Sequence, residues 1–266
     1  MQGFSHAFWD TRPGLRLYPV LGVRMISLAL LAFVLSLVVT LWVRRLFRRR
    51  AARYADDAPQ RFHWGETPRL GGLGLLAGWA IALAALPLLQ RAHMAGNIDS
   101  VKLHLGTWLL MLLPAFVGGV LEDMTQRLRV SWRLLLTLTS GLLAWGVLGV
   151  SVPHLGFGWI DPYWAAWPWL GIALAVLAVT GLPHAFNIID GYNGLAGAVA
   201  LVVCLALAHV ALQVGDRELA AVAIALAAAT AGFMVWNYPR GLIFAGDAGA
   251  YLWGLLIAAI SLQLVQ

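Results

Sequence analysis

Eight long apolar stretches run through this sequence and constrain its fold more than any other feature. Each is roughly 20 residues long, the length an α-helix needs to cross the hydrocarbon core of a bilayer. The stretches are 25–43, 70–89, 105–121, 134–152, 167–186, 194–214, 219–236 and 248–265, and none contains Asp, Glu, Lys or Arg. With 61% hydrophobic and only 11% charged residues, the composition excludes an ordinary soluble domain. We therefore predict an all-α fold, a polytopic transmembrane helical bundle of about eight spans.

The same stretches predict the domain organisation. They occupy most of the 266 residues, so we expect a single transmembrane domain over 1–266 and no sizeable soluble domain. The first stretch is longer than the apolar region of a signal peptide, which is roughly 7–15 residues, and we expect it to be retained as a span.

Basic residues between the first two stretches predict the orientation. The segment 44–69 contains Arg44, Arg45, Arg48, Arg49, Arg50, Arg53, Arg61 and Arg69. Because cytosolic loops are enriched in Lys and Arg, we expect a basic cytosolic loop here, in a bacterial inner (plasma) membrane. Eight spans then place 122–133, 187–193 and 237–247 on the cytosolic face too. The net charge of +6 is gathered between spans, which favours membrane lipid over nucleic acid as the partner.

Four acidic residues stand at the predicted cytosolic ends of spans: Glu122, Asp123, Asp190 and Asp247. A single acid in such a place can be a solvated helix cap, but four acids from three segments indicate a shared site. A lipid flippase or ion-coupled transporter would be expected to place its acids near the middle of the bilayer. Acids gathered at one face instead favour an enzyme that acts on a lipid headgroup at the cytosolic surface.

The surroundings of these acids indicate phosphate chemistry. Asp190 follows Asn187 in a polar run, and Asp247 lies among small residues at the start of the last span. Carboxylate and amide oxygens suit Mg²⁺, and arginines such as Arg133 suit phosphate. We therefore predict Mg²⁺-dependent phosphoryl transfer. Gly71 and Gly72 at the mouth of the second span fit close helix packing and ligand approach equally well.

These motifs, in this order, resemble those of the polyprenyl-phosphate N-acetylhexosamine-1-phosphate transferases. This family includes the peptidoglycan lipid I synthase and the enzymes that initiate O-antigen and teichoic acid. The resemblance spans about residues 66 to 254. It rests on Pro68-Arg-Leu-Gly71-Gly72, on Gly119-Val-Leu-Glu122-Asp123 with Arg133 downstream, on Ala185-Phe-Asn187-Ile-Ile-Asp190-Gly191-Tyr-Asn193-Gly194-Leu195, and on Phe244-Ala-Gly246-Asp247-Ala-Gly249. The Glu-Asp pair and the third motif look more like the O-antigen-type branch.

The resemblance implies a reaction and roles for particular residues. The reaction is transfer of an N-acetylhexosamine 1-phosphate from a UDP-sugar to undecaprenyl phosphate, with release of UMP, to start a glycan such as O-antigen. By position, Asp247 matches the Mg²⁺-binding aspartate, with Asn187 beside it, and Asp190 belongs to the nucleotide-sugar site. Glu122 and Asp123 match paired acids, with Asp123 as an orienting or deprotonating group. The residues expected to contact substrate are Gly71, Gly72, Arg133, Asn187 and Asn193.

Three departures from the family pattern leave an alternative open. Glu122 stands where many members have Asp, and Asn193 replaces a second aspartate. The sequence ends at Gln266, whereas family members continue into a cytosolic loop with histidines and arginines, so we expect a chain that is short at its C-terminus. The alternative is a truncated or inactive homologue that binds polyprenyl lipid or a partner without turnover. The sequence specifies neither the sugar nor whether the chain forms an oligomer.

Overall fold

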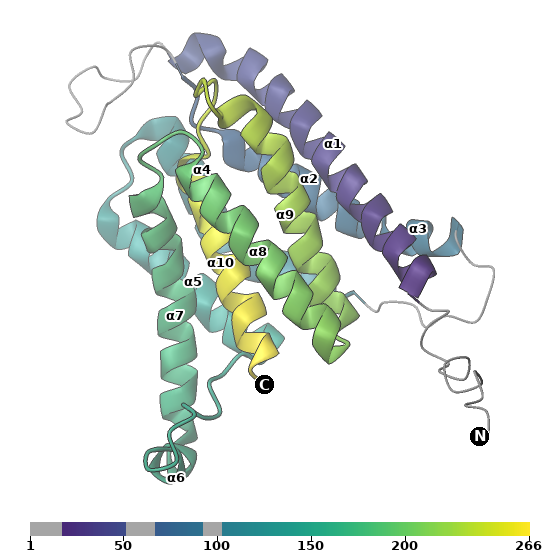
Figure 1. Cartoon of the computed structure of the whole chain (residues 1–266). Coiled ribbons are helices and arrows are strands. Elements are labelled where there is room, and N and C mark those ends of the chain that lie inside the picture. The colour runs from purple at the N-terminus through teal and green to yellow at the C-terminus, as the bar shows by residue number, and fades with distance from the viewer. Residues whose placement is uncertain (1–17, 52–66, 93–102) are drawn as a thin grey trace, which may run out of the picture.

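The chain is helical throughout its described part. The computed structural model describes residues 18–51, 67–92 and 103–266, and in these ranges it contains helices and no strands. The helices are α1 (Tyr18–Ala51), α2 (Gly71–Ala84), α3 (Leu86–Ala92), α4 (Leu105–Thr125), α5 (Val130–Leu148), α6 (Asp161–Ala166), α7 (Pro168–Ile189), α8 (Leu195–Val214), α9 (Arg217–Asn237) and α10 (Gly246–Leu264) (Figure 1). The predicted all-α class is confirmed.

The second predicted span is not one helix. Within the described residues, seven helices are long and apolar enough to cross a membrane. Helix α2, however, has only 14 residues and is followed, after Ala85, by the short α3. The break lies beside Pro87, which has no backbone N–H and whose ring clashes with the carbonyl group four residues earlier in a helix. The described residues therefore agree with a bundle of about eight spans, except that the broken α2–α3 pair replaces the continuous helix predicted over 70–89.

The predicted basic loop begins as helix. Helix α1 continues without a break through Arg44 and Arg45 to Ala51, so its last two turns contain residues that we expected in the loop. The guanidinium carbon of Arg44 lies 5.9 Å from the ring centroid of Trp236 at the end of α9, a cation–π contact. Residues 52–66 of the predicted loop lie outside the described residues.

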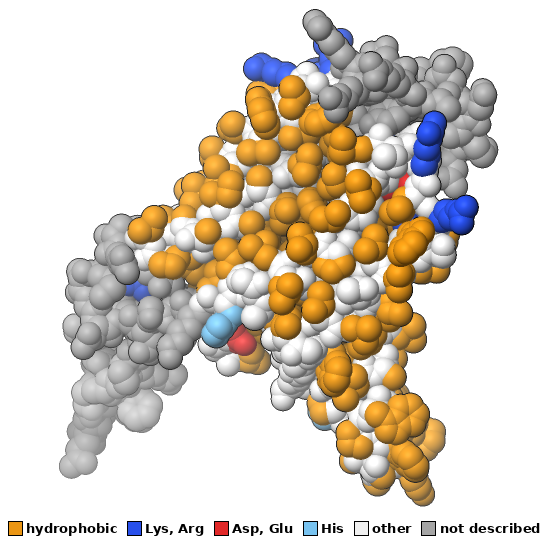
Figure 2. Space-filling view, turned by 180° about the vertical axis from the view of Figure 1, so that it is seen from behind, with side chains coloured by type: hydrophobic (Ala, Val, Ile, Leu, Met, Phe, Trp, Pro, Cys, Tyr) orange, Lys and Arg blue, Asp and Glu red, His pale blue; other side chains and the backbone are white. Residues whose placement is uncertain are grey.

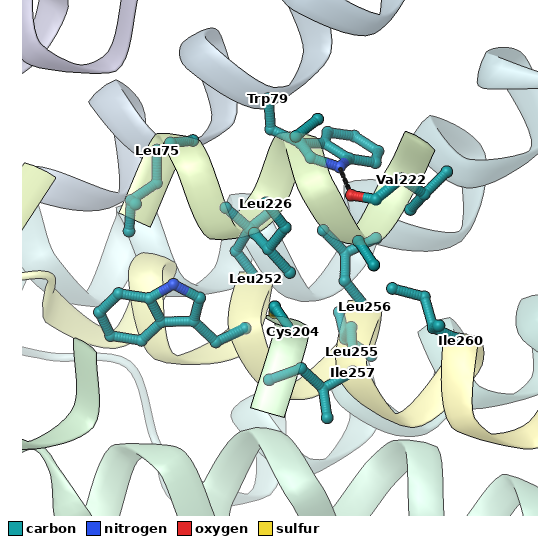
Figure 3. Packing of buried hydrophobic residues seen from close by; sticks show 14 of the residues in the cluster. Leu75, Trp79, Cys204, Val222, Leu226, Leu252, Leu255, Leu256, Ile257 and Ile260 are labelled. Carbon is teal, nitrogen blue, oxygen red and sulfur yellow. Dashed lines mark hydrogen bonds between the residues drawn. The ribbon is translucent and has the colours of Figure 1, made fainter. Parts of the chain in front are cut away.

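Helix α10 is the centre of the bundle. Every residue from Ala248 to Ile260 is buried, and the helix packs against α2, α4, α7 and α8. In Figure 3, Leu252 of α10 faces the interior together with Leu226 of α9. The Trp79 indole in α2 donates a hydrogen bond to the Val222 carbonyl in α9, at 3.3 Å. Such complete burial means that the first residues of α10 lie inside the protein rather than at its edge.

All the acidic motifs lie at one end of the bundle, as the sequence predicted. Helices α2, α5, α8 and α10 begin at the end where α4, α7 and α9 finish, which is the upper end in Figure 1. We call this the motif end, because it holds 67–72, 122–133, 187–194 and 237–247. The opposite end has α6 and the exposed side chains of Trp159 and Tyr163, which are typical of a membrane–water interface.

The outer surface suits a lipid environment. Hydrophobic side chains cover the middle of the face in Figure 2, while most of the visible Lys and Arg side chains gather near its upper end. On α1 the exposed residues Ile26, Leu30, Val34, Val38 and Trp42 recur every four residues and form one apolar stripe. The chain is accordingly a multi-pass integral membrane protein.

The close approach of α2 and α4 to α10 depends on glycines, and this can be tested. A β-carbon at Gly72 would meet the backbone of Gly249 at 2.5 Å, and one at Gly119 would meet the backbone of Ala248 at 2.6 Å. We expect Gly72→Ala and Gly119→Ala each to lower the free energy of unfolding by about 1–3 kcal/mol, because overpacking forces the helices apart. Thermal unfolding in detergent would measure this. Gly146→Ala is the control, since no atom lies within 4 Å of its added β-carbon; equal stability of all three variants would contradict the prediction.

Candidate active site

The Asp247 carboxylate is the point where three helices meet. It lies in the first turn of α10, and its side chain is only 16% exposed. Its Oδ2 accepts a hydrogen bond from Arg133 Nη1 of α5 at 2.9 Å and a longer one from the Tyr251 hydroxyl at 3.3 Å. Its Oδ1 accepts from Asn187 Nδ2 of α7 at 2.7 Å. The structure thus brings together Arg133, Asn187 and Asp247, which the sequence analysis had placed in one site.

Asp123 holds the start of α10 from outside that helix. Its side chain is buried at the end of α4, and its Oδ1 and Oδ2 accept the backbone N–H groups of Asp247 and Ala248 at 2.8 and 3.0 Å. The first N–H groups of a helix have no partner within it. A carboxylate there accepts their hydrogen bonds and interacts favourably with the positive end of the helix dipole. Gly246, with φ +72°, lies so close that a β-carbon would collide with both carboxylate oxygens. Asp123 therefore positions the backbone that bears Asp247.

Glu122 faces a different part of the chain from its neighbour. The half-buried Glu122 Oε2 accepts the backbone N–H of Leu128 at 2.8 Å. This bond closes the turn between α4 and α5, in which Gln126 adopts the left-handed conformation with φ 52°. The observed contact of Glu122 is thus with a connecting turn, and its catalytic role stays a prediction.

Asp190 lies just after α7, near enough to Asp247 for the two carboxyl groups to interact electrostatically. Burial raises the pKa of Asp190 to about 7, the positive charge of Arg69 opposes this rise, and the negative charge of Asp247 adds to it. The carboxyl group therefore titrates near neutral pH in the protein alone. A cation bound among these acids would favour its ionised form.

Two side-chain amides, Asn237 at the end of α9 and Asn193 just before α8, bond within or to the loop that follows Asp190. The buried Asn237 accepts the Gly194 backbone N–H at 2.7 Å through Oδ1 and donates to the Ile243 carbonyl at 2.9 Å through Nδ2. Asn237 thereby joins the start of α8 to the segment that leads into α10. Asn193, a predicted substrate contact, donates to the Pro239 carbonyl at 3.1 Å, so its observed bond is within the same set of turns.

Gly71 and Gly72, the two predicted substrate contacts, pack against the backbone of other segments rather than facing open space. The N–H groups of Gly71 and Gly72 donate to the carbonyls of Phe244 and Ala245, both at 2.9 Å, and the N–H of Phe244 donates to the Pro68 carbonyl at 2.9 Å. Both glycines are buried, and a β-carbon on either would strike protein atoms. Close packing therefore explains these glycines, while contact with substrate stays a prediction.

An apolar groove of about 500 Å³ adjoins the loop after Asp190. Tyr192 and Tyr238, which are 67% and 60% exposed, stand on its walls. Its lining residues are Tyr192, Asn193, Gly194, Leu195, Ala198, Met234 and Tyr238. The groove lies between the start of α8 and the end of α9 and offers aromatic and aliphatic surface beside the charged site.

Tyr251 and Asn237 belong to the site and were not found by sequence reasoning. Tyr251 follows Asp247 by one helical turn, so the spacing of four residues could have revealed it. His184, on α7, contacts the Tyr251 ring edge to face, with centroids 5.5 Å apart, and shares a hydrogen bond of 3.0 Å with Thr137. Asn237 has no such local signal, because its partners belong to other segments.

The donor set at Asp247 suits Mg²⁺. Among the described residues, no group of three or more His, Cys, Asp or Glu side chains could hold a metal ion by itself. Mg²⁺, however, commonly takes one or two protein carboxylates and completes its octahedron with water and substrate phosphates. Asp247 would supply a carboxylate, and Asn187 would supply its amide oxygen after the amide turns away from the bond it now donates.

Comparison with known proteins decides the family. The sequence profile of Glycosyl transferase family 4 matches residues 105–265, which contain all four acids. The chain belongs to this family. It is 30% identical to the phospho-N-acetylmuramoyl-pentapeptide-transferase of Moorella thermoacetica, over 88% of this chain and 75% of that protein. It is 29% identical to the decaprenyl-phosphate N-acetylglucosaminephosphotransferase of Mycolicibacterium smegmatis, over 90% of this chain and 61% of that protein.

These family relatives set the level of detail that the comparison supports. The chain spans between 61% and 75% of the length of the relatives it matches. Pentapeptide transferases and N-acetylglucosaminephosphotransferases match it to a similar degree. This chain therefore resembles sugar-1-phosphate transferases in general, and the comparison does not single out the O-antigen-type branch.

The capping role of Asp123 predicts different effects of two substitutions. Asp123→Ala leaves the buried N–H of Ala248 and the half-buried N–H of Asp247 without their acceptor, at a cost of about 1–3 kcal/mol for the buried group. Asp123→Asn keeps one acceptor oxygen, so we expect it to retain more thermal stability than the alanine variant. Thermal unfolding of both proteins in detergent measures the difference. Equal stability of Asp123→Ala and the unchanged protein would refute the capping role.

The titration of Asp190 predicts a dependence of stability on pH. Its folded-state pKa of about 7 lies above the ordinary value of 3.8, so the folded state binds more protons between these values. The free energy of unfolding of the metal-free protein should therefore fall as pH rises through this interval and level off above about pH 8. In Asp190→Asn this contribution is absent. Melting temperatures from pH 5 to 8 in EDTA test it, and parallel curves for the two proteins would contradict it.

Proposed function

We propose that the chain transfers an N-acetylhexosamine 1-phosphate from a UDP-sugar to undecaprenyl phosphate and releases UMP. The observation that supports this most is the direct bonding of Asp247 to Asn187 and Arg133 at the motif end of the bundle. A metal-binding carboxylate beside a guanidinium group suits two phosphate-bearing substrates, one of them anchored in the bilayer. We further propose that the motif end faces the cytosol of a plasma membrane, since Arg44, Arg45 and Arg48 of α1 lie at that end.

The reaction exchanges one phosphoanhydride bond for another. An oxygen of the polyprenyl phosphate attacks the phosphorus that bears the sugar, the bond from that phosphorus to the UMP oxygen breaks, and UMP leaves with the electron pair. The product is a polyprenyl diphosphate-sugar. No general base is required, because a phosphomonoester with a second pKa near 6 is mostly dianionic at neutral pH. Catalysis then consists largely of positioning and charge neutralisation.

Each residue has a place in this proposal. Asp247 and Asn187 hold Mg²⁺, which when bound neutralises the phosphate oxygens. Arg133 keeps the Asp247 carboxylate oriented and contacts phosphate, while Asp190 contacts the nucleotide sugar. Asp123 orients Asp247 through the start of α10, with its two oxygens already bonded there.

The remaining predicted residues act at the border of the site. We propose that Glu122 shapes the α4–α5 turn beside the lipid phosphate, and that Gly71 and Gly72 shape the mouth at which substrate approaches. Asn193 lines the groove that receives an apolar part of a substrate. We assign the chain to the O-antigen-type branch on its Glu122-Asp123 pair and its Asn187 to Leu195 motif.

Release of UMP by the purified protein tests the function. The assay contains undecaprenyl phosphate and a panel of UDP-N-acetylhexosamines, with Mg²⁺ or with EDTA. We expect release that depends on the metal, with at least about a hundredfold loss in Asp247→Asn because the site then lacks its central negative charge. Asp216→Asn is the matched control, since it makes the same change in the cap of α9 at the opposite end and keeps an acceptor for the Leu219 N–H.

The outcomes separate the two candidate functions. Release with one donor names that sugar. A folded protein that binds polyprenyl phosphate but releases no UMP with any donor would instead be the homologue without turnover. Full activity of Asp247→Asn would remove this carboxylate from the mechanism.

A further inference from the structure

Arg69 is fixed beside the centre of the site by its backbone. It lies just before α2, between Pro68 and Gly71, whose carbonyl and N–H both bond to Phe244 at 2.9 Å. The positive-φ turn at Gly246 packs directly against the Arg69 carbonyl oxygen. The residue before Asp247 in the chain therefore touches the backbone of Arg69, although the two are distant in sequence.

The charge of Arg69 acts on the acids of the site. It is the largest charge influence on Asp190, where it opposes the rise of the pKa caused by burial, and it also acts on Asp123. Arg133, the other cation at the centre, is occupied by its bond to Asp247. Within the described ranges, by contrast, the half-buried Arg69 side chain has no hydrogen bond or ion pair. A guanidinium group with five N–H donors is thus available beside a cluster of acids.

The balance of charge explains what such a cation would bind. Asp123, Asp190 and Asp247 repel the phosphates of any substrate, and Arg133 offsets only one of these carboxylates. The contact of the Arg69 carbonyl oxygen with the turn at Gly246 fixes the backbone of this residue close to these acids. A planar guanidinium group binds phosphate through two parallel hydrogen bonds, which lysine cannot reproduce.

We propose that Arg69 binds a phosphate group of the substrates and is a further residue of the reacting site. This rests on the proposed function. The shared chemistry is a phosphate oxyanion, which belongs either to the phosphomonoester of the lipid acceptor or to the diphosphate of the nucleotide sugar. Arg69 would contribute a permanent positive charge close to Asp190 and Asp247, in addition to that of Arg133.

Steady-state kinetics distinguish the two phosphates. We expect Arg69→Ala to lower kcat/KM by about ten- to hundredfold, the usual effect of removing a hydrogen bond to a charged group, and Arg69→Lys to retain part of the activity. A rise in KM for the UDP-sugar assigns Arg69 to the diphosphate, and a rise in KM for undecaprenyl phosphate assigns it to the acceptor. Arg45→Ala is the control, because it removes an exposed positive charge on α1 at the same end of the bundle.

A binding measurement makes the test independent of turnover. Equilibrium binding of UDP-N-acetylglucosamine and of farnesyl phosphate is measured for the unchanged protein, Arg69→Gln and Arg69→Lys, each with its melting temperature. We expect weaker binding of one probe to Arg69→Gln at unchanged stability. The proposal is overturned if Arg69→Gln binds both probes and turns over within about twofold of Arg45→Ala, or if the unchanged protein binds neither probe. Absence of turnover in the unchanged protein with binding intact would count against the proposed function alone.

Discussion

The hydrogen bonds from the start of α10 to Asp123 are the interaction on which the rest of the site depends. Helix α10 is buried from Ala248 to Ile260, so its first N–H groups cannot be hydrated and need acceptors inside the protein. Asp123 supplies both oxygens from the end of α4, 124 residues away from Asp247 in the chain. This anchoring fixes the backbone position of Asp247. Its side chain can then accept hydrogen bonds from donors on α5 and α7.

The site gathers more negative charge than it neutralises by itself. Asp123, Asp190 and Asp247 share a partly buried end of the bundle, where burial raises the pKa of Asp190 and the negative charge of Asp247 adds to this rise. Such a concentration of acids is unfavourable in the protein alone, but it suits a site that receives a divalent cation. Close packing around α10 supplies the stability that holds these groups together, with glycines at the contacts where two backbones meet.

Much of the fold follows from short-range features of the sequence. Apolar stretches without charges predicted the helices, because a backbone in lipid must satisfy its own hydrogen bonds. The prediction failed at 70–89, where Pro87 interrupts the helix, although the proline was visible in the sequence. The gathering of the four acids at one end also followed from counting spans. The cap provided by Asp123 and the link made by Asn237 did not, since each joins segments that are far apart in the chain.

The sequence by itself determined which stretches, apart from 70–89, form helices long and apolar enough to cross a membrane, and that the four acids share one end of the bundle. Those properties depend on local composition and on alternating helix direction. Only the tertiary structure decided what adjacent residues do: Asp123 turns inward to α10, whereas Glu122, about 100° around the same helix, bonds to the next turn. It also decided that Gly71 and Gly72 lie against the backbone before α10 and that Arg69 stands beside Gly246. The physical reason is that these contacts depend on which helices pack together, and no periodicity within one segment records its distant partners.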